Sequence, residues 1–115
     1  MSAFQNEVQH CFPYLFNKWG FKFLRSDNDC EDFVAIAESD TLKIRFIRDR
    51  TDFFLDVTRI NELNKWQGFY KILDSLNATQ KTHIKYKYSN KMKTVSSLLE
   101  EQFPKIQDFF ANRSN

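Results

Sequence analysis

Two aspartates, Asp52 and Asp56, are the residues of this chain whose type and spacing come nearest to a catalytic pair. Side chains four residues apart on a β-strand point to the same face, so two carboxylates placed in this way could share general acid–base work. Arg48 and Arg59 are close by in the sequence and could neutralise them instead. We expect the second arrangement, in which both aspartates are solvated strand residues.

The other residues that could do chemistry are isolated. His10 precedes Cys11, but adjacent residues of a helix point about 100° apart, which does not align a nucleophile with a base. His83 stands among lysines. The sequence has no closely spaced set of metal ligands, and two glycines are too few for a phosphate-binding loop. We therefore expect no enzyme, no metal site and no cofactor.

The chain that carries these residues has an ordinary globular composition. Its 115 residues are 42% hydrophobic and 28% charged, which suits a single domain spanning residues 1–115. Thirteen phenylalanines indicate a core packed with aromatic rings. Because neither a membrane-spanning run nor a signal peptide is apparent, we expect a cytoplasmic protein with no membrane contact. Cys11 and Cys30 are then reduced thiols, with one disulfide between them as the alternative.

The clearest structural pattern is an alternation of apolar and polar residues in the run LKIRFIRDRTDFFLDV at 42–57. The alternation has period two and is broken once, at a charged turn. It predicts an antiparallel hairpin with one buried face. Asp49 and Arg50 are expected at the turn, and Phe46, Phe53 and Leu55 are expected in the core.

Weaker patterns predict the remaining elements. An N-terminal helix is expected behind a capping box formed by Ser2 and Gln5, with an interruption at Pro13. A helix capped by Asn64 carries Trp66 on its apolar stripe, and a last helix covers about 93–110. Two further strands are expected, one from Phe21 to Phe23 and one over 32–38.

The predicted fold is α+β, with an N-terminal helix, a four-stranded antiparallel meander sheet and two C-terminal helices packed on one sheet face. A fifth strand at 83–88 is an open alternative, because apolar residues there alternate with lysines, as they do in many edge strands.

Acidic residues are concentrated in one part of the chain, behind a net charge of only +2. The acidic segment, 27–40, contains no Lys or Arg. Its six carboxylates belong to Asp27, Asp29, Glu31, Asp32, Glu38 and Asp40. Such a negative patch could steer association with a basic protein, or it could be a solvated edge.

Lysines are concentrated in a second part of the chain. The basic segment, 79–93, contains no acid. Its lysines and the tyrosines between them are Lys81, Lys85, Tyr86, Lys87, Tyr88, Lys91 and Lys93. These residues could follow a nucleic-acid backbone while the rings stack on bases. A solvated edge protected by lysines is the reading that we favour.

The stretch from Trp19 to Trp66 resembles a group of small bacterial proteins. Their pattern is a strand that begins with Gly-Phe, an acidic turn, a strand pair and a helix with a Trp. It appears here as Gly20-Phe21, RFIRDR at 45–50, LDV at 55–57 and Trp66. This chain departs from the pattern at Thr51, where glycine is usual.

Proteins of this group are similar to the immunity proteins of bacterial toxin systems, including contact-dependent growth inhibition. The resemblance implies stoichiometric, non-catalytic neutralisation of a cognate toxin domain, which we expect to be a nuclease. It carries over no toxin-binding residues. We therefore take the acidic segment as the candidate toxin-binding site on charge alone, and nucleic-acid binding by the basic segment as the alternative function.

Overall fold

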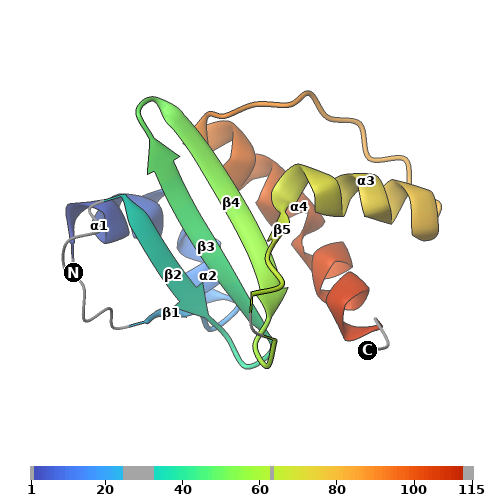
Figure 1. The fold of residues 1–115 in the computed structure, drawn as a ribbon, viewed down its shortest axis with the longest axis horizontal. Helices are drawn as coiled ribbons and strands as arrows, with labels where there is room; N and C mark the ends of the chain where they lie inside the picture. The colour runs from blue at the N-terminus through green and yellow to red at the C-terminus, as the bar shows by residue number, and fades with distance from the viewer. Residues whose placement is uncertain (1, 25–32, 63, 113–115) are drawn as a thin grey trace.

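The structure of this protein is a computed structural model that describes residues 2–24, 33–62 and 64–112. Within these ranges the chain forms helices and a five-stranded antiparallel sheet in the order β1-β2-β3-β4-β5 (Figure 1). The helices are α1 (Ala3–Cys11), α2 (Pro13–Asn17), α3 (Phe69–Thr79) and α4 (Met92–Ala111). The strands are β1 (Lys22–Phe23), β2 (Val34–Glu38), β3 (Leu42–Asp49), β4 (Asp52–Arg59) and β5 (Gln67–Gly68). The predicted α+β class is confirmed.

The N-terminal helices begin as the sequence predicts. The Ser2 hydroxyl accepts a hydrogen bond from the Gln5 N–H at 3.1 Å, and the Gln5 side chain accepts one from the Ser2 N–H at 3.0 Å. Pro13 is the first residue of α2, where its missing N–H would have had no partner in the helix. The interruption predicted at Pro13 is therefore a break between two helices. In the described part of the chain, none of the helices is long and apolar enough to cross a membrane.

The hairpin of β3 and β4 closes through a two-residue turn. Asp49 and Asp52 are the last paired residues, so the turn consists of Arg50 and Thr51, one residue later than predicted. Arg50 adopts a φ of +61°, in the left-handed region. Two-residue hairpin turns need positive φ at their first central position, which glycine adopts without steric cost.

This backbone angle predicts opposite effects of glycine at the two turn positions. We expect Arg50→Gly to leave the free energy of unfolding unchanged or raise it by up to about 1 kcal/mol, because relief of the left-handed strain offsets the entropy of glycine. Thr51→Gly should lower the same free energy by about 0.5–1 kcal/mol, because no strain is relieved there. Urea denaturation of both variants measures the difference. Equal destabilisation at both positions would contradict the turn geometry.

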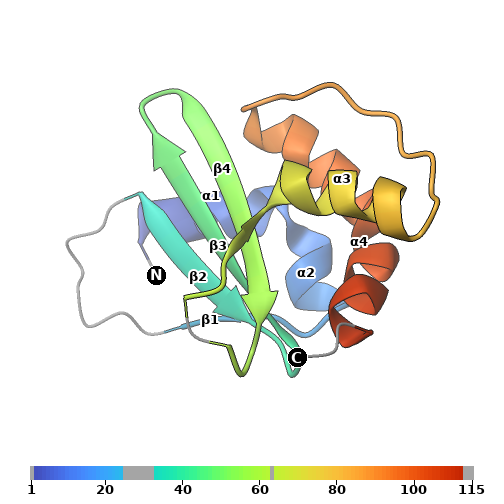
Figure 2. The ribbon, with the colours of Figure 1, turned by 45° about the vertical axis from the view of Figure 1, so that its right-hand side comes forward.

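The core lies between the sheet and the helices behind it (Figures 1 and 2). Alternate residues of β2, β3 and β4 are buried there. They are Ala35, Ala37, Leu42, Ile44, Phe46, Phe53, Leu55 and Val57. The Phe12 ring from the helical side lies 5.2 Å from that of Phe46 and 5.8 Å from that of Phe53, between ring centres. The predicted aromatic core is confirmed, as is the burial of Phe46, Phe53 and Leu55.

A buried polar contact joins the N-terminal helices to α4. The Tyr14 hydroxyl donates a hydrogen bond to the Ser96 carbonyl at 2.7 Å, and the Ser96 hydroxyl donates to the Cys11 carbonyl at 2.6 Å. Burial raises the pKa of Tyr14 well above its ordinary value. The phenol is therefore a neutral donor at all physiological pH values. This contact ties residues more than eighty positions apart in the sequence.

One prediction about the C-terminal half is wrong, and one open alternative is excluded. The helix expected from Asn64 begins at Phe69, and its N-cap is Gly68 in an extended conformation. Residues 83–88 form no strand, and β5 is the pair Gln67–Gly68 instead. In both cases tertiary contacts compete with the local pattern, because Gln67 and Gly68 pair with Val57 and Asp56 of β4.

Candidate binding surfaces

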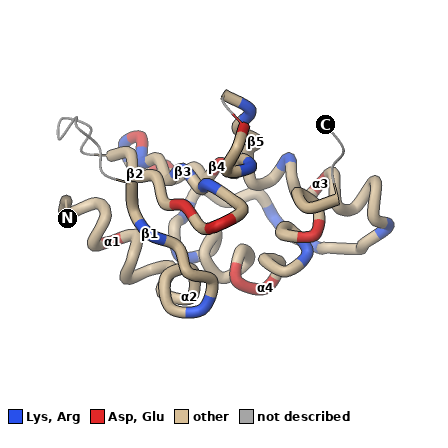
Figure 3. The backbone as a smooth tube through the Cα atoms, turned by 90° about the horizontal axis from the view of Figure 1, so that it is seen from below, with Lys and Arg blue, Asp and Glu red and all other residues tan. Residues whose placement is uncertain are grey.

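One face of the sheet is left without a helix. Helices α1, α2 and α4 lie on one side, and in the described part of the chain no helix covers the other (Figure 3). Ile47 of β3 pairs with Val34 of β2 and with Phe54 of β4, so three apolar residues form a row across this face. We call the surface formed by Val34, Ile36, Arg45, Ile47, Phe54 and Asp56 the open face. Phe54 is 36% exposed.

A charged and aromatic cluster borders this apolar row. Arg45 of β3 pairs across the strands with Asp56 of β4, and its Nη2 and Nε atoms lie 2.7 and 3.1 Å from the Asp56 Oδ2 atom. The guanidinium carbon lies 4.5 Å from the centre of the Trp66 ring. An ion pair and a cation–π contact therefore hold one side chain in place. The open face thus combines an apolar row with a positioned polar rim.

The structure places only part of the predicted acidic site. Asp27, Asp29, Glu31 and Asp32 lie outside the described residues. Glu38 is half-buried at the end of β2, opposite Lys43 of β3. Asp40 is exposed in the turn that follows, beside a pocket at the end of α4. The two described carboxylates therefore flank one end of the sheet.

Between the end of α3 and the start of α4, residues 80–91 of the basic segment have no regular secondary structure (Figure 2). The Asn77 side chain holds its first part, since it accepts a hydrogen bond from the Ile84 N–H at 2.8 Å and donates one to the Ile84 carbonyl at 3.1 Å. Lys85 and Lys87 are exposed, as are Lys81, Lys91 and Lys93. The lysines thus point to solvent, as both readings of the segment require.

Tyr70 of α3 holds the second part of the basic segment. Its hydroxyl donates to the Ser89 carbonyl at 2.9 Å and accepts from the Ser89 N–H at 3.1 Å. The rings of Tyr86 and Tyr88 lie 5.2 and 4.8 Å from the Tyr70 ring, between centres. Tyr86 also donates to Asp74, and burial together with this carboxylate raises the pKa of Tyr86 to about 12. Tyr86 therefore packs within the protein, whereas Tyr88 is 63% exposed.

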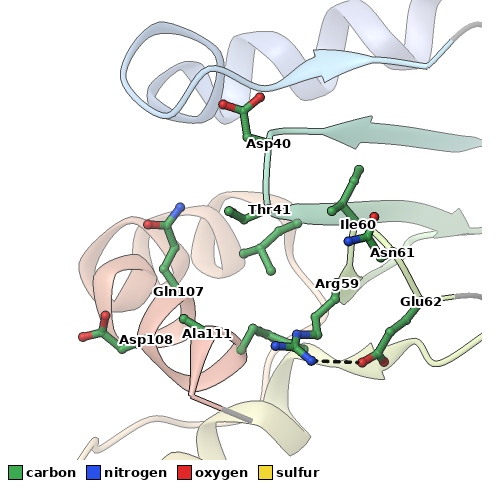
Figure 4. A pocket seen from close by; sticks show the side chains of 11 residues that line it. Asp40, Thr41, Arg59, Ile60, Asn61, Glu62, Gln107, Asp108 and Ala111 are labelled. Carbon is green, nitrogen blue, oxygen red and sulfur yellow. Dashed lines mark hydrogen bonds and ion pairs between the residues drawn. The ribbon is translucent and has the colours of Figure 1, made fainter. Parts of the chain in front are cut away.

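A pocket of about 460 Å³ lies where the end of β4 meets the last turn of α4 (Figure 4). Asp40 and Thr41 form one wall, and Gln107 and Asp108 come from the helix. Arg59 and Glu62 form an ion pair at 3.5 Å on the third side. The charged groups shown here belong to separate walls, and Arg59 is already paired, so the pocket assembles no recognisable reaction centre from its described lining.

The residues considered for catalysis are not brought together. Asp56 pairs with Arg45, a partner that the sequence analysis did not name, and Asp52 is exposed at the start of β4. Arg48 forms an ion pair with Glu7 of α1. His10 and His83 are exposed on different elements. Within the described ranges, no three His, Cys, Asp or Glu residues are grouped so that they could hold a metal ion.

Comparison of this chain with protein-family models, with curated proteins and with solved structures found no match. The similarity to immunity proteins therefore stays a prediction, and function has to be argued from the surfaces. Sequence reasoning missed the cluster of Arg45, Asp56 and Trp66. Its signal was present in part, because a two-residue turn at Arg50 and Thr51 places Arg45 opposite Asp56.

Proposed function

We propose that this protein is an immunity protein that neutralises a cognate bacterial toxin domain by stoichiometric binding, without catalysis. The observation that carries the proposal is the open face. Its apolar row of Val34, Ile47 and Phe54 lies beside the charged rim of Arg45 and Asp56. An apolar centre with a polar rim is the usual anatomy of a protein–protein interface.

The rigidity of the open face supports a binding role. The row is carried by three paired strands, so binding would order few backbone groups. Because little conformational entropy is lost on binding, more of the favourable contact free energy contributes to affinity. Arg and Trp, the residue types at the rim, are also among those that contribute most to binding when they are buried in an interface.

The acidic segment favours a basic toxin domain as the partner. This segment includes β2, whose residues Val34 and Ile36 belong to the open face. Enzymes that act on nucleic acid have basic clefts, and complementary charge speeds the association of two proteins. The support for a nuclease is therefore the combination of an acidic segment with an adjoining apolar face.

The proposal is tested by co-expression with a toxin. We expect the gene upstream of this one to encode a large secreted protein with a toxic C-terminal domain. Producing that domain in bacteria should stop growth, and this chain should restore growth and form a one-to-one complex with the domain in size-exclusion chromatography. Growth arrest that this chain does not relieve, with no complex formed, would overturn the proposal.

The contribution of the acidic segment has its own test. We expect charge reversal at Asp29, Glu31 and Asp32 to slow association with the toxin domain by about tenfold or more at low salt, because electrostatic steering acts on the association rate. Thermal unfolding of the variant checks that it is folded. Stopped-flow binding measures the rate. An unchanged rate in a folded variant would mean that this segment does not face the toxin.

A further inference from the structure

The outer edge of β4 is paired in two separate places. The register with β5 ends where Asp56 meets Gly68. Three residues earlier, the Phe53 N–H donates a hydrogen bond to the Asn90 carbonyl at 2.8 Å. Between these two points lies a cavity of about 150 Å³, which we call the slot. The slot is thus a gap between β5 and the end of the basic segment.

The slot has an apolar floor and aromatic walls. Leu55 of β4 and Val95 of α4 are both buried, at 3% and 1% exposure. The aromatic residues Phe54, Tyr70 and Tyr88 also line it. An apolar cavity of about 150 Å³ can hold benzene, so this slot has the volume for one aromatic ring. Its size and lining therefore suit a single hydrocarbon ring.

The exposed wall of the slot is held in position before any ligand arrives. Tyr88 packs one side against Tyr70, with 4.8 Å between ring centres. The neighbouring residue, Ser89, is fixed by both hydrogen bonds to the Tyr70 hydroxyl. A large apolar ring that stays 63% exposed while its backbone is fixed is available to a partner.

The charge around the slot specifies the kind of partner. Lys87 and Lys91 are exposed and adjacent in sequence to Tyr88 and Asn90, which both line the slot. The one carboxylate among the described lining residues, that of Asp56, is neutralised by Arg45 at 2.7 Å. Carboxylates of a partner would therefore meet lysines at the rim of the slot.

We propose that the slot binds an aromatic side chain of an acidic peptide segment, with the ring against Leu55 and Val95 and the carboxylates beside Lys87 and Lys91. A nucleic-acid base fits less well, because its polar edges would lie against an apolar floor and lose their hydrogen bonds with water. This inference does not depend on toxin neutralisation, although the slot shares Phe54 and Asp56 with the open face, because it concerns an acidic peptide rather than a basic toxin domain.

The test uses the whole protein and three synthetic peptides, in isothermal titration calorimetry at low salt. The first is the acetylated and amidated peptide Glu-Asp-Phe-Asp-Glu. The second has Ala in place of Phe, and the third has Lys in place of every acid. We expect the first to bind at least about tenfold more tightly than either of the others, because the second lacks the aromatic ring and the third lacks the carboxylates.

Three variants assign the binding to the slot. Tyr88→Ala should weaken binding of the acidic Phe peptide about tenfold, whereas Tyr88→Phe, which keeps the ring, should leave it unchanged. Phe33→Ala removes another exposed ring, 56% exposed and outside the slot, and should also have no effect. Thermal unfolding of each variant checks that the fold is intact.

Two results would overturn the inference. Equal binding of the peptides with Phe and with Ala, or unchanged binding by a folded Tyr88→Ala variant, would mean that no ring enters the slot. Tighter binding of a thymidine oligonucleotide than of the acidic peptide, lost in Tyr88→Ala, would mean that the occupant is a nucleic acid. Both outcomes leave the toxin co-expression test unaffected.

Discussion

Phe46→Ala should lower the free energy of unfolding by about 3–5 kcal/mol, one of the two largest effects that we expect of any change in this protein. Phe46 has no exposed surface, and its ring packs against that of Phe12, with 5.2 Å between centres. Truncation removes apolar contacts and leaves a cavity that the sheet can close only in part, because β3 is held by a strand on either side. Denaturant titration measures the loss.

Two matched variants make this measurement decisive. Leu55→Ala, at the position paired with Phe46, should cost about 2–5 kcal/mol for the same reason. Phe33→Ala deletes the same ring as Phe46→Ala but from a site that is 56% exposed, so its cost should stay within about 0.5 kcal/mol. Losses below about 0.5 kcal/mol at both Phe46 and Leu55 would mean that the strand faces are assigned wrongly.

The second large effect concerns the proposed interface. The double change of Ile47→Glu and Phe54→Glu should weaken toxin binding by about 100-fold or more. Ile47 is the middle residue of the apolar row and pairs with Phe54 across β3 and β4, and two carboxylates there would have to be buried without partners. Titration with the purified toxin domain measures affinity, and bacterial growth under co-expression measures protection.

Lys105→Glu is the matched control. It changes the net charge by the same amount as the double variant, but Lys105 is exposed on α4, on the other side of the sheet (Figure 3). We expect it to bind and protect as the unaltered protein does. Full protection by a folded double variant would show that the toxin contacts a different surface, and the proposal for the open face would then be abandoned.

Elements encoded by nearby residues could be predicted from the sequence. The capping box of Ser2 and Gln5, the break at Pro13 and the hairpin between 42 and 59 all depend on contacts within a few residues or on strict alternation. Burial of Phe46, Phe53 and Leu55 follows from the same alternation, since one face of such a hairpin must be covered. These features therefore depend little on contacts with distant parts of the chain.

The prediction for Trp66 failed because a distant partner outweighed local spacing. Trp66 fits the apolar stripe of a helix that would start at Asn64. Its ring instead lies over Arg45 of β3, and the chain pairs with β4 as far as Gly68 before the helix begins. Helical spacing indicates which residues would share a face of a helix. It does not indicate where the chain will instead pair with the edge of a sheet.

The alternating lysines and tyrosines of the basic segment left a fifth strand as an open alternative, and residues 83–88 form none. Alternation makes an extended backbone favourable, but it does not determine whether that backbone pairs with a neighbouring strand. Side chains satisfy several of its backbone groups instead: the Asn77 amide bonds Ile84, and the Tyr70 hydroxyl bonds Ser89. No rule of local pattern assigns such bonds, because they join α3 to residues up to nineteen positions away.

The sequence by itself thus determined the fold class, the main hairpin, its buried face and the segregation of charge, because each depends on composition or on local periodicity. Only the tertiary structure decided which surfaces could bind a partner. The open face requires three strands in register, and the slot requires β4, α3, α4 and the basic segment to meet. Both are properties of residues far apart in the chain, whose contacts are set by packing of the whole domain.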